Sequence, residues 1–507
     1  MTQRAIGTET EYGIYQPGDP YANPIHLSTE AVRTYADVSR APLPAVGWDY
    51  RAEDPLNDIR GMRLDRARVD PSLLTDDPYH LAPPGGSEEL PLPTAEQERL
   101  FHPTSIVLTN GARFYVDHAH PEYSSPETSN ARDAVLWDRA GDEIARRVMR
   151  LREEGGGPPL VLVKNNVDGK GATYGAHENY QVSRLADLDD IIRFMIPFLV
   201  TRPLICGAGR VGIGQRSERA GFQISQRADY VENDVGLETT FNRPIFNTRD
   251  EPHADHHRWR RIHVIGGDAN QFDVSMLLRL GTTQLVLRAL EEGTTLDWET
   301  LALDDPVRAA HEVSYDLTLS RPLSLRDGET ATALEIQRRY RDLVAQALQG
   351  RLSEVDQEVM ERWDSVLTRM AGDIFSVAHE VEWVGKLALF TRQRQRLGVA
   401  WNDPRLLAMD VHWATLDPRQ SLVTALDRAG MVERLFSADQ VAWAADHPPS
   451  DTRAARRGQA VRDYAALRGA SWTSLVFEDV DGDRLVRVPL ADPLYAGHNP
   501  DKEPSVG

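Results

Sequence analysis

Strand-like patterns gather in the first half of this chain, and helical patterns gather in the second. Alternation of apolar and polar residues predicts strands at 4–15, 105–120 and 260–268. In the second half, apolar residues recur at helical spacing, most clearly over 275–293 and 335–374. Because the two kinds of element are segregated rather than alternating, the sequence predicts an α+β fold and not a parallel α/β sheet.

Shorter elements complete this arrangement. A helix is expected over 129–153, where apolar residues at helical spacing end before three consecutive glycines. Further strands are predicted at 160–167, 177–184 and 222–231.

Two stretches stand apart from this pattern. Residues 36–104 hold many Pro, Gly and Asp residues with little periodicity, which is typical of a functional loop or a disordered insertion. After about residue 430 the chain has its own pattern of two short helices and a hairpin over 471–490. We therefore expect a large domain over 1–430, which carries the insertion, and a small C-terminal domain over 431–507.

Composition excludes several classes of protein. The 507 residues have a net charge of −20, which argues against binding to nucleic acid. No apolar run approaches the roughly 20 residues that cross a bilayer, and the first residues lack the features of a secretory signal. The single cysteine, Cys206, fits a reducing compartment, and its apolar neighbours favour a buried structural thiol over a nucleophile. We expect a cytoplasmic protein with neither a membrane nor a nucleic-acid partner.

The stretch 110–123 could carry chemistry. On a strand, Arg113, Tyr115 and Asp117 share one face, while the opposite face is apolar and suits a core. Glu122 follows directly, and the first strand carries Glu9 and Glu11 on one shared face. A polar strand face is often only a solvated one, and this alternative stays open here.

Carboxylates that meet on a sheet repel one another unless a cation lies between them. Magnesium is the natural partner, since it takes oxygen ligands and commonly bridges to nucleotide phosphates. Arg113 on the same face would suit phosphate oxygens through its planar guanidinium group. The pattern indicates a magnesium–nucleotide site.

A second cluster, at 242–264, combines arginines with four histidines. The histidines are His253, His256, His257 and His263. Their spacing matches none of the paired ligand patterns that zinc sites show. Arg243 and Arg249 suit a clamp for phosphate or carboxylate, or else they pair with nearby acids.

The segment 207–212 satisfies the G-x-G-x-x-G pattern of dinucleotide-binding loops. The residues after it lack the apolar periodicity of a phosphate-binding helix, and no alternating βαβ pattern surrounds it. We therefore do not expect a dinucleotide site there.

Seven sequence segments in the first 270 residues are more specific than the residue spacings described above. They are GTETEYGI, NGARFYVDHAHPEYSSPE, VKNNVDGKGATYGAHENY, PFLVTRPLICGAG, SQRADY, RPIFNTRDEPHAD and RRIHVIGGDAN. Through them the chain resembles the Pup ligases and depupylases of actinobacteria, which are relatives of glutamine synthetase and other carboxylate–amine ligases. The resemblance implies a large glutamine synthetase-like domain, with a curved, mainly antiparallel sheet packed on helices, and a small C-terminal domain.

Position by position, the resemblance implies a site for ATP and Mg²⁺ in which Asp117 is the catalytic carboxylate. The implied metal ligands are Glu9, Tyr115 and Glu122, with His177 on the metal or phosphate side. The implied ATP contacts are Arg113, Ser125 and Trp472, with Arg227 and Arg249 on the phosphate side.

The family holds two opposed activities. The ligase joins the C-terminal glutamate of Pup to a substrate lysine, whereas the depupylase hydrolyses that bond and deamidates a C-terminal glutamine of Pup. The long interval between Glu9 and Asp117, the loop-like string WDYRAEDPLNDIRGMRLD, and VDHAHPEY, where ligases read closer to LDVGSHPEY, resemble the depupylase. The resemblance implies ATP- and magnesium-dependent hydrolysis, with Pup ligation as the alternative.

The implied partners are Pup and pupylated proteins. Because Pup is acidic in this family, its docking surface is expected to be basic. The candidates are Arg227, Arg258, Arg260 and Arg261, although pairing with local acids explains such arginines equally well. We expect a monomer. Whether Asp117 attacks the carbonyl directly or activates a water is open.

Overall fold

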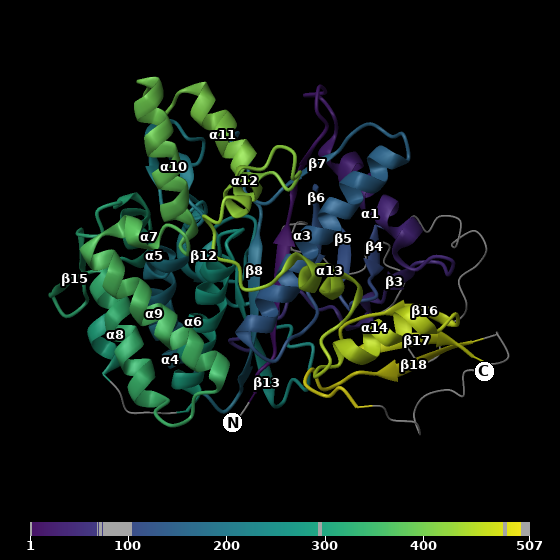
Figure 1. The fold of residues 1–507 in the computed structure, drawn as a ribbon. Helices are drawn as coiled ribbons and strands as arrows, with labels where there is room; N and C mark the ends of the chain where they lie inside the picture. Colours follow the sequence, from purple (N-terminus) through teal and green to yellow (C-terminus); the bar gives the residue numbers. More distant parts are fainter. Residues whose placement is uncertain are drawn as a thin grey trace.

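The computed structural model describes residues 3–67, 69, 74, 104–292, 297–479 and 484–497. About half of the predicted insertion over 36–104 lies outside the described residues, namely 68, 70–73 and 75–103. A large sheet runs through the molecule, with the helical layer of α4, α6, α8 and α9 on one side and the C-terminal strands at the opposite end (Figure 1). This mixed architecture confirms the α+β fold class.

The main sheet has 12 strands in the order β11-β12-β13-β8-β1-β6-β5-β4-β3-β16-β17-β18. Its strands are β1 (Ile6–Glu11), β3 (Val46–Trp48), β4 (Ser105–Val107), β5 (Arg113–Asp117), β6 (His120–Ser124), β8 (Ala176–Ser183), β11 (Asn233–Gly236), β12 (Pro244–Asn247), β13 (Trp259–Val264), β16 (Leu467–Ala470), β17 (Ser474–Glu478) and β18 (Leu485–Pro489). Neighbouring strands are antiparallel except in the pairs β11–β12 and β3–β16.

Three two-stranded sheets accompany it. They are β2 (Gly13–Tyr15) with β7 (Val161–Val163), β9 (Arg210–Ile213) with β10 (Arg219–Gln223), and β14 (Pro322–Ser324) with β15 (Thr330–Thr332).

The helices supply the layers on which the main sheet packs. The α-helices are α1 (Pro24–Ser39), α3 (Ala131–Glu154), α4 (Leu188–Thr201), α5 (Pro203–Cys206), α6 (Asp273–Glu291), α7 (Pro306–Tyr315), α8 (Ala333–Ala347), α9 (Glu354–Gly372), α10 (Glu382–Leu397), α11 (Pro404–Ala414), α12 (Leu422–Arg428), α13 (Ala438–Asp446) and α14 (Ala454–Asp463). Short 3₁₀ turns lie at Tyr50–Ala52, Ala228–Tyr230, Trp298–Leu301 and Ile374–Val377. Among the described residues no helix has the length and apolar character needed to traverse a bilayer.

The two largest hydrophobic cores pack on the sheet, and a smaller one lies between the C-terminal strands, β3, β4 and α14. One of the two largest forms among α4, α6, α8 and α9, and α6 is buried almost all round, so it shows little polar face. The other lies between the sheet and helices α1, α3 and α13. Ala112 and Phe114 of the predicted apolar face are fully buried in this second core. The opposite face of β5 is therefore directed away from that core, as the alternation predicts.

Most predicted elements are confirmed, including the helix over 129–153, which is α3, and the C-terminal hairpin, which is β17–β18. The expected helix over 335–374 is two helices, α8 and α9. The break falls where Ser353 caps α9, with its side chain and that of Asp356 exchanging hydrogen bonds with the backbone.

The predicted strand over 222–231 is wrong beyond Gln223. The Asp268 carboxylate accepts hydrogen bonds from the Ser225 hydroxyl, at 2.8 Å, and from the backbone N–H of Gln226. These side-chain bonds replace a ladder and turn the chain into a 3₁₀ segment at Ala228–Tyr230.

The glycine-rich motif leads into strand β9 of the β9–β10 hairpin, and no helix follows it directly. Gly209 lies just before β9 and Gly212 within it, with positive φ angles of +72° and +94°. Cys206 is buried just before this motif, and burial raises the pKa of its thiol to about 12, so this thiol is a poor nucleophile.

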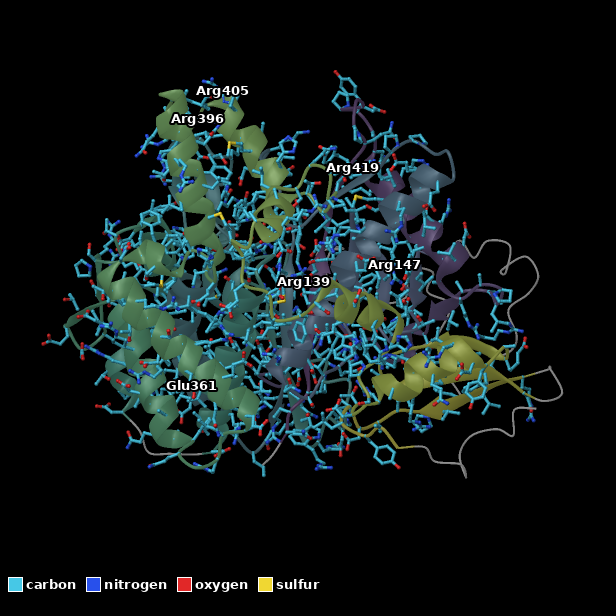
Figure 2. The ribbon with its side chains drawn as sticks, viewed as in Figure 1. Arg139, Arg147, Glu361, Arg396, Arg405 and Arg419 are labelled. Atoms are coloured by element: carbon cyan, nitrogen blue, oxygen red, sulfur yellow. The ribbon has the colours of Figure 1, made fainter. Side chains whose placement is uncertain are left out.

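The C-terminal strands extend the main sheet, because β16 pairs with β3 of the N-terminal part. The domain boundary near residue 430 stays a prediction. Elsewhere, α10 and α11 project from the helical body, and the exposed Arg396 and Arg405 lie near the end of this projection (Figure 2).

Candidate active site

Strand pairing brings residues from four strands into one row across the sheet. Glu9 on β1 pairs with His177 on β8 at one side and with Ser124 on β6 at the other. Ser124 in turn pairs with Arg113 on β5. Residues in register on adjacent strands lie side by side on the same face, so this row groups three of the predicted site residues.

A second row lies beside the first. Glu11 pairs with Glu122, and Glu122 pairs with Tyr115. Asp117 closes the β5–β6 hairpin opposite His120. The carboxylates of the first strand and of the 110–123 stretch therefore meet, as the shared faces of the two stretches predict.

These rows form one wall of a cavity of about 680 Å³. Every predicted site residue except Ser125 lines it. These residues are Glu9, Arg113, Tyr115, Asp117, Glu122, His177, Arg227, Arg249 and Trp472.

Three carboxylates gather at one point in the cavity. Oxygen atoms of Glu11, Asp117 and Glu122 lie within 4.8 Å of one another. Burial, followed by the negative charges of Asp117 and Glu11, raises the pKa of Glu122 well above its usual value. An all-oxygen set of buried, mutually repelling carboxylates fits a hard divalent cation such as Mg²⁺, whose charge would relieve the repulsion.

A second group of possible ligands lies on the neighbouring strands. One ligand atom each from Glu9, His177 and His263 falls within 4.8 Å of the others, and His177 Nδ1 lies 3.1 Å from Glu9 Oε2. Burial opposes ionisation of Glu9, but the His177 hydrogen bond and the charge of His263 bring its pKa well below the usual value. An ionised carboxylate with two imidazoles suits a divalent cation.

Arg113 is held among aromatic rings. Its guanidinium carbon lies 3.8 Å from the ring centre of Tyr115, 4.4 Å from that of Trp48 and 5.3 Å from that of Tyr50. Its Nε donates to Ser105 Oγ at 2.9 Å. A guanidinium fixed in this way can present its charge to a phosphate with little further loss of side-chain freedom.

Trp472 comes from the turn before β17 and closes the same end of the cavity. Its ring packs edge-on against Trp48, with ring centres 4.9 Å apart, and against the Arg457 guanidinium at 4.8 Å. Ser125 lies in a smaller adjoining cavity of about 80 Å³, which Trp472 also lines. The Ser125 hydroxyl oxygen accepts a hydrogen bond from the Thr8 N–H at 2.9 Å.

The opposite wall is cationic. Arg227 is buried, and its guanidinium donates to neutral acceptors, the Tyr174 carbonyl at 3.0 Å and the Ile265 carbonyl at 3.2 Å. Burial and the neighbouring Arg243 lower the pKa of Arg227 to about 10. This wall therefore holds positive charge that suits an anionic group of a ligand.

Arg249 also lines the cavity, and its Nε lies 2.7 Å from Glu251 Oε2. It therefore combines the two roles that the sequence left open, because it forms an ion pair and still faces the cavity.

The basic candidates for docking divide into two pairs. Arg227 and Arg261 line the cavity, and Arg261 contacts Glu9 and Glu251 at 3.8 and 3.4 Å. Arg258 and Arg260 do not line it. Arg260 donates to the carbonyl oxygens of Ala186 and Arg184 beside the β8–α4 turn.

The four histidines do not form one site. The rings of His256 and His257 contact each other in an exposed loop, with ring centres 3.9 Å apart and an interplanar angle of 41°. His253 and His263 line the cavity separately. His253 lies with Glu53 and Glu251, whereas His263 joins the group around Glu9.

Sequence reasoning missed several residues of the cavity. Tyr50 and Glu53 come from the start of the predicted insertion, where the pattern carries no periodicity. Glu251 and His263 lie in the 242–264 stretch. One signal was available for His263, because it alternates with Arg261 on a predicted strand and so shares its face.

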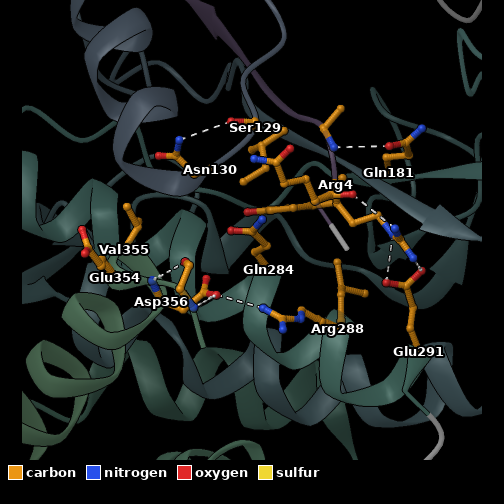
Figure 3. Close-up of a pocket in the computed structure, with 16 residues that line it drawn as sticks. Arg4, Ser129, Asn130, Gln181, Gln284, Arg288, Glu291, Glu354, Val355 and Asp356 are labelled. Atoms are coloured by element: carbon orange, nitrogen blue, oxygen red, sulfur yellow. Dashed lines mark hydrogen bonds and ion pairs between the residues drawn. The ribbon is translucent and has the colours of Figure 1, made fainter. Parts of the chain in front are cut away.

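A second cavity, of about 370 Å³, lies on the other side of β1 near the chain start (Figure 3). Four of its five charged side chains are already paired, since Arg4 bonds Glu291 at 3.2 Å and Arg288 bonds Asp356 at 2.8 Å, and the fifth is the acid Glu354. Internal pairing of this kind leaves little net charge for a ligand, so the first cavity is the better candidate.

Comparisons with known proteins agree with this geometry. The family model described as Pup-ligase protein matches residues 4–476. A protein named Pup deamidase/depupylase from Mycolicibacterium smegmatis is 44% identical over 498 residues, which cover 97% of this chain and 95% of that protein.

Two solved structures share the fold. The crystal structure of the complex between the prokaryotic ubiquitin-like protein Pup and its ligase PafA has a TM-score of 0.76 and 29% identity, covering 98% of this chain and 89% of the other. The structure of the Pup ligase PafA in complex with ADP has a TM-score of 0.71 and 34% identity, covering 83% of this chain and 96% of the other. The resemblance seen in the sequence is confirmed, and this chain belongs to the Pup-ligase family.

Proposed function

We propose that this protein hydrolyses the amide bond at the C-terminal end of Pup. It would release Pup from the lysine side chains of other proteins and convert a C-terminal glutamine of Pup into glutamate. The observation that carries the proposal is the position of Asp117 beside Glu11 and Glu122 in the large cavity. The near full-length likeness to a protein named as a Pup deamidase/depupylase supports this reaction.

The reaction requires ATP and magnesium in this proposal. The ADP complex of a related ligase supports a nucleotide, and the all-oxygen set around Glu122 supports Mg²⁺. The residues that would hold the cations are Glu9, Tyr115, Glu122 and His177, with Glu11 and His263 added by the geometry. The residues that would hold the nucleotide are Arg113, Ser125, Arg249 and Trp472. When bound, the cations and phosphates supply a charged frame that polarises the carbonyl of the bond to be cleaved.

The cationic wall binds the free carboxylate of the terminal Pup residue in this arrangement. Arg227 and Arg243 repel one another, and among the described residues neither forms an ion pair within 4.0 Å with a carboxylate, although Glu11 lies close enough to act on both charges. An anionic group between them therefore gains interactions with both. Replacing Arg243 by Gln is expected to raise the KM for Pup about tenfold while changing kcat less, as steady-state kinetics would measure. An unchanged KM would place the carboxylate elsewhere.

Asp117 acts on the carbonyl by one of two routes. In the first, a carboxylate oxygen of Asp117 attacks the carbonyl carbon, the C–N bond breaks, the amine leaves with a proton, and water hydrolyses the resulting anhydride. In the second, Asp117 takes a proton from a water whose oxygen adds to the carbonyl carbon, and the amine then leaves. Both routes need the Asp117 carboxylate close to the bound amide.

The test is incubation of a pupylated protein with the enzyme, with and without ATP, followed by gel analysis for free Pup. We expect release of Pup in the presence of ATP. The Asp117→Asn variant should lose about a thousandfold in turnover while binding ATP with similar affinity in calorimetry. Asp439→Asn, on an exposed turn of α13, is the matched control and should keep full activity. Normal turnover by Asp117→Asn would refute the role of Asp117.

Pup ligation is the second candidate, because both solved relatives described above are Pup ligases. Mixing the protein with Pup that ends in glutamate, ATP and a lysine-bearing acceptor protein separates the two. Accumulation of conjugate without release would establish ligation.

A further inference from the structure

The turn that follows Asp117 has an unusual backbone. The β5–β6 hairpin closes at the pair Asp117–His120, so its loop consists of His118 and Ala119. His118 has a φ angle of +50°, in the left-handed region. Two-residue hairpin loops require a positive φ at the first loop position, where Gly, Asn or Asp are the usual residues because a larger side chain is strained there. A histidine held in this conformation at the site suggests a role for its side chain.

The imidazole of His118 contacts the proposed catalytic carboxylate. His118 Nδ1 lies 3.0 Å from Asp117 Oδ1, and both residues line the large cavity. The turn is also anchored from behind. The buried Ser28 hydroxyl on α1 donates a hydrogen bond to the Ala119 carbonyl at 2.8 Å. The left-handed backbone and the Ser28 anchor together set where the imidazole lies relative to Asp117.

We propose that His118 is a positioning residue for Asp117. Its Nδ1–H donates to Asp117 Oδ1, which holds the carboxylate in one orientation and leaves Oδ2 for the bound amide or its attacking water. The inference rests on the proposed function of Asp117, and it adds a residue that acts through Asp117 without contacting the reacting bond. In this view the strained turn is kept because glycine, which fits the backbone better, has no group to hold the carboxylate.

Two substitutions separate the side chain from the backbone. His118→Gly fits the left-handed position and removes the imidazole. His118→Asn also tolerates that position but keeps a side-chain N–H donor. Ser28→Ala removes the anchor of the turn without touching the cavity. We expect kcat for Pup release to fall about thirtyfold in His118→Gly, to recover at least partly in His118→Asn, and to fall by a smaller factor in Ser28→Ala, which keeps the imidazole but removes the anchor of its turn. KM for Pup should stay within twofold in all three.

The outcomes are distinct. A His118→Gly enzyme with wild-type kcat, or one whose KM rises while kcat is kept, would overturn the inference while leaving the proposed function intact. If the wild type releases no Pup, the proposed function fails. Crystal structures of the wild type and of His118→Gly then still decide the inference, which predicts one Asp117 carboxylate orientation in the former and more than one in the latter. The same orientation in both would overturn it.

Discussion

Strand β1 separates two buried groups of carboxylates that differ in how their charge is balanced. Behind β1, Asp138 and Asp142 of α3 surround Lys164, whose Nζ lies 2.5 Å from one and 3.0 Å from the other. The alternate residues of the first strand region, Thr10 and Tyr12, donate hydrogen bonds to these acids. In front of β1, Glu11, Asp117 and Glu122 meet without a lysine among the described residues that line the cavity.

One acid of each group, Asp138 behind β1 and Glu122 in front of it, has its pKa shifted in the opposite direction from the other. Glu11 in the front group has a local partner instead, because burial opposes its ionisation but the hydrogen bond with His120 lowers its pKa to about 2. Although burial opposes ionisation of Asp138, the charge of Lys164 lowers its pKa below the usual value. Burial and the like charges of Asp117 and Glu11 raise the pKa of Glu122. The comparison teaches that a buried acid with its own cation is part of the framework, whereas buried acids without one form a site for a cation that comes from outside.

Removing the internal cation tests the first half of this comparison. Lys164→Met removes the ion pairs of Asp138 and Asp142 with Lys164 and leaves Asp142 its 3.6 Å contact with Arg139. We therefore expect the free energy of unfolding to fall by about 3–5 kcal/mol. Urea denaturation would measure this. The matched control is Lys170→Met on an exposed turn, which should change stability by less than about 0.5 kcal/mol. Equal effects of the two substitutions would show that the ion pairs behind β1 contribute nothing.

Acid titration tests another internally balanced carboxylate. Burial opposes ionisation of Glu127, but Arg457 and Arg453 lower its pKa to about 2. The unfolded value is about 4.3. Because the folded pKa is the lower one, the stabilisation is complete above about pH 4.3 and is lost as the pH falls toward 2. We expect the stability difference between wild type and Glu127→Gln, about 3 kcal/mol at neutral pH, to shrink over that range.

The control for this titration is Glu361→Gln, at an exposed position of α9 (Figure 2). Its stability difference from the wild type should stay near zero at every pH. A constant difference for Glu127→Gln between pH 4.3 and 2 would contradict the lowered pKa.

Adding magnesium tests whether the carboxylates in front of β1 bind a cation. Magnesium at about 100 times its Kd should raise the free energy of unfolding by about 2.7 kcal/mol, and chelation should reverse the gain. Glu122→Gln should abolish most of this gain. In metal-free buffer the same variant should be more stable than wild type by about 1 kcal/mol, because it removes a repelling charge. A Glu122→Gln protein that still gains the full stabilisation would place the magnesium elsewhere.

Strand alternation in the sequence was enough to predict which residues of the site share a face. The shared face of Glu9 and Glu11, and that of Arg113, Tyr115 and Asp117, were predicted from a period of two residues, and the structure brings both faces together. The roles of these residues came only from the family resemblance and stay proposals, because no periodicity separates a metal ligand from a residue that binds phosphate.

The parts of the fold and of the site that the sequence did not predict depend on contacts between distant segments of the chain. Trp48 and Glu53 belong to a stretch without periodicity. The pairing of β3 with β4 and β16 places Trp48 against Arg113 and Trp472, and Glu53 in the cavity lining. The end of the predicted strand over 222–231 depends on Asp268, more than 30 residues further along the chain. Such contacts leave no local pattern from which one sequence could predict them.

The pairing of β3 with β16 has a consequence for the timing of biosynthesis. One end of the cavity is closed where Trp48 meets Trp472, so it forms only after β16 and Trp472 have left the ribosome. A nascent chain can fold its central strands early, but it lacks that closure until these distant residues emerge. Premature termination before β16 would therefore yield a protein that keeps its carboxylates and lacks the closed end of its cavity.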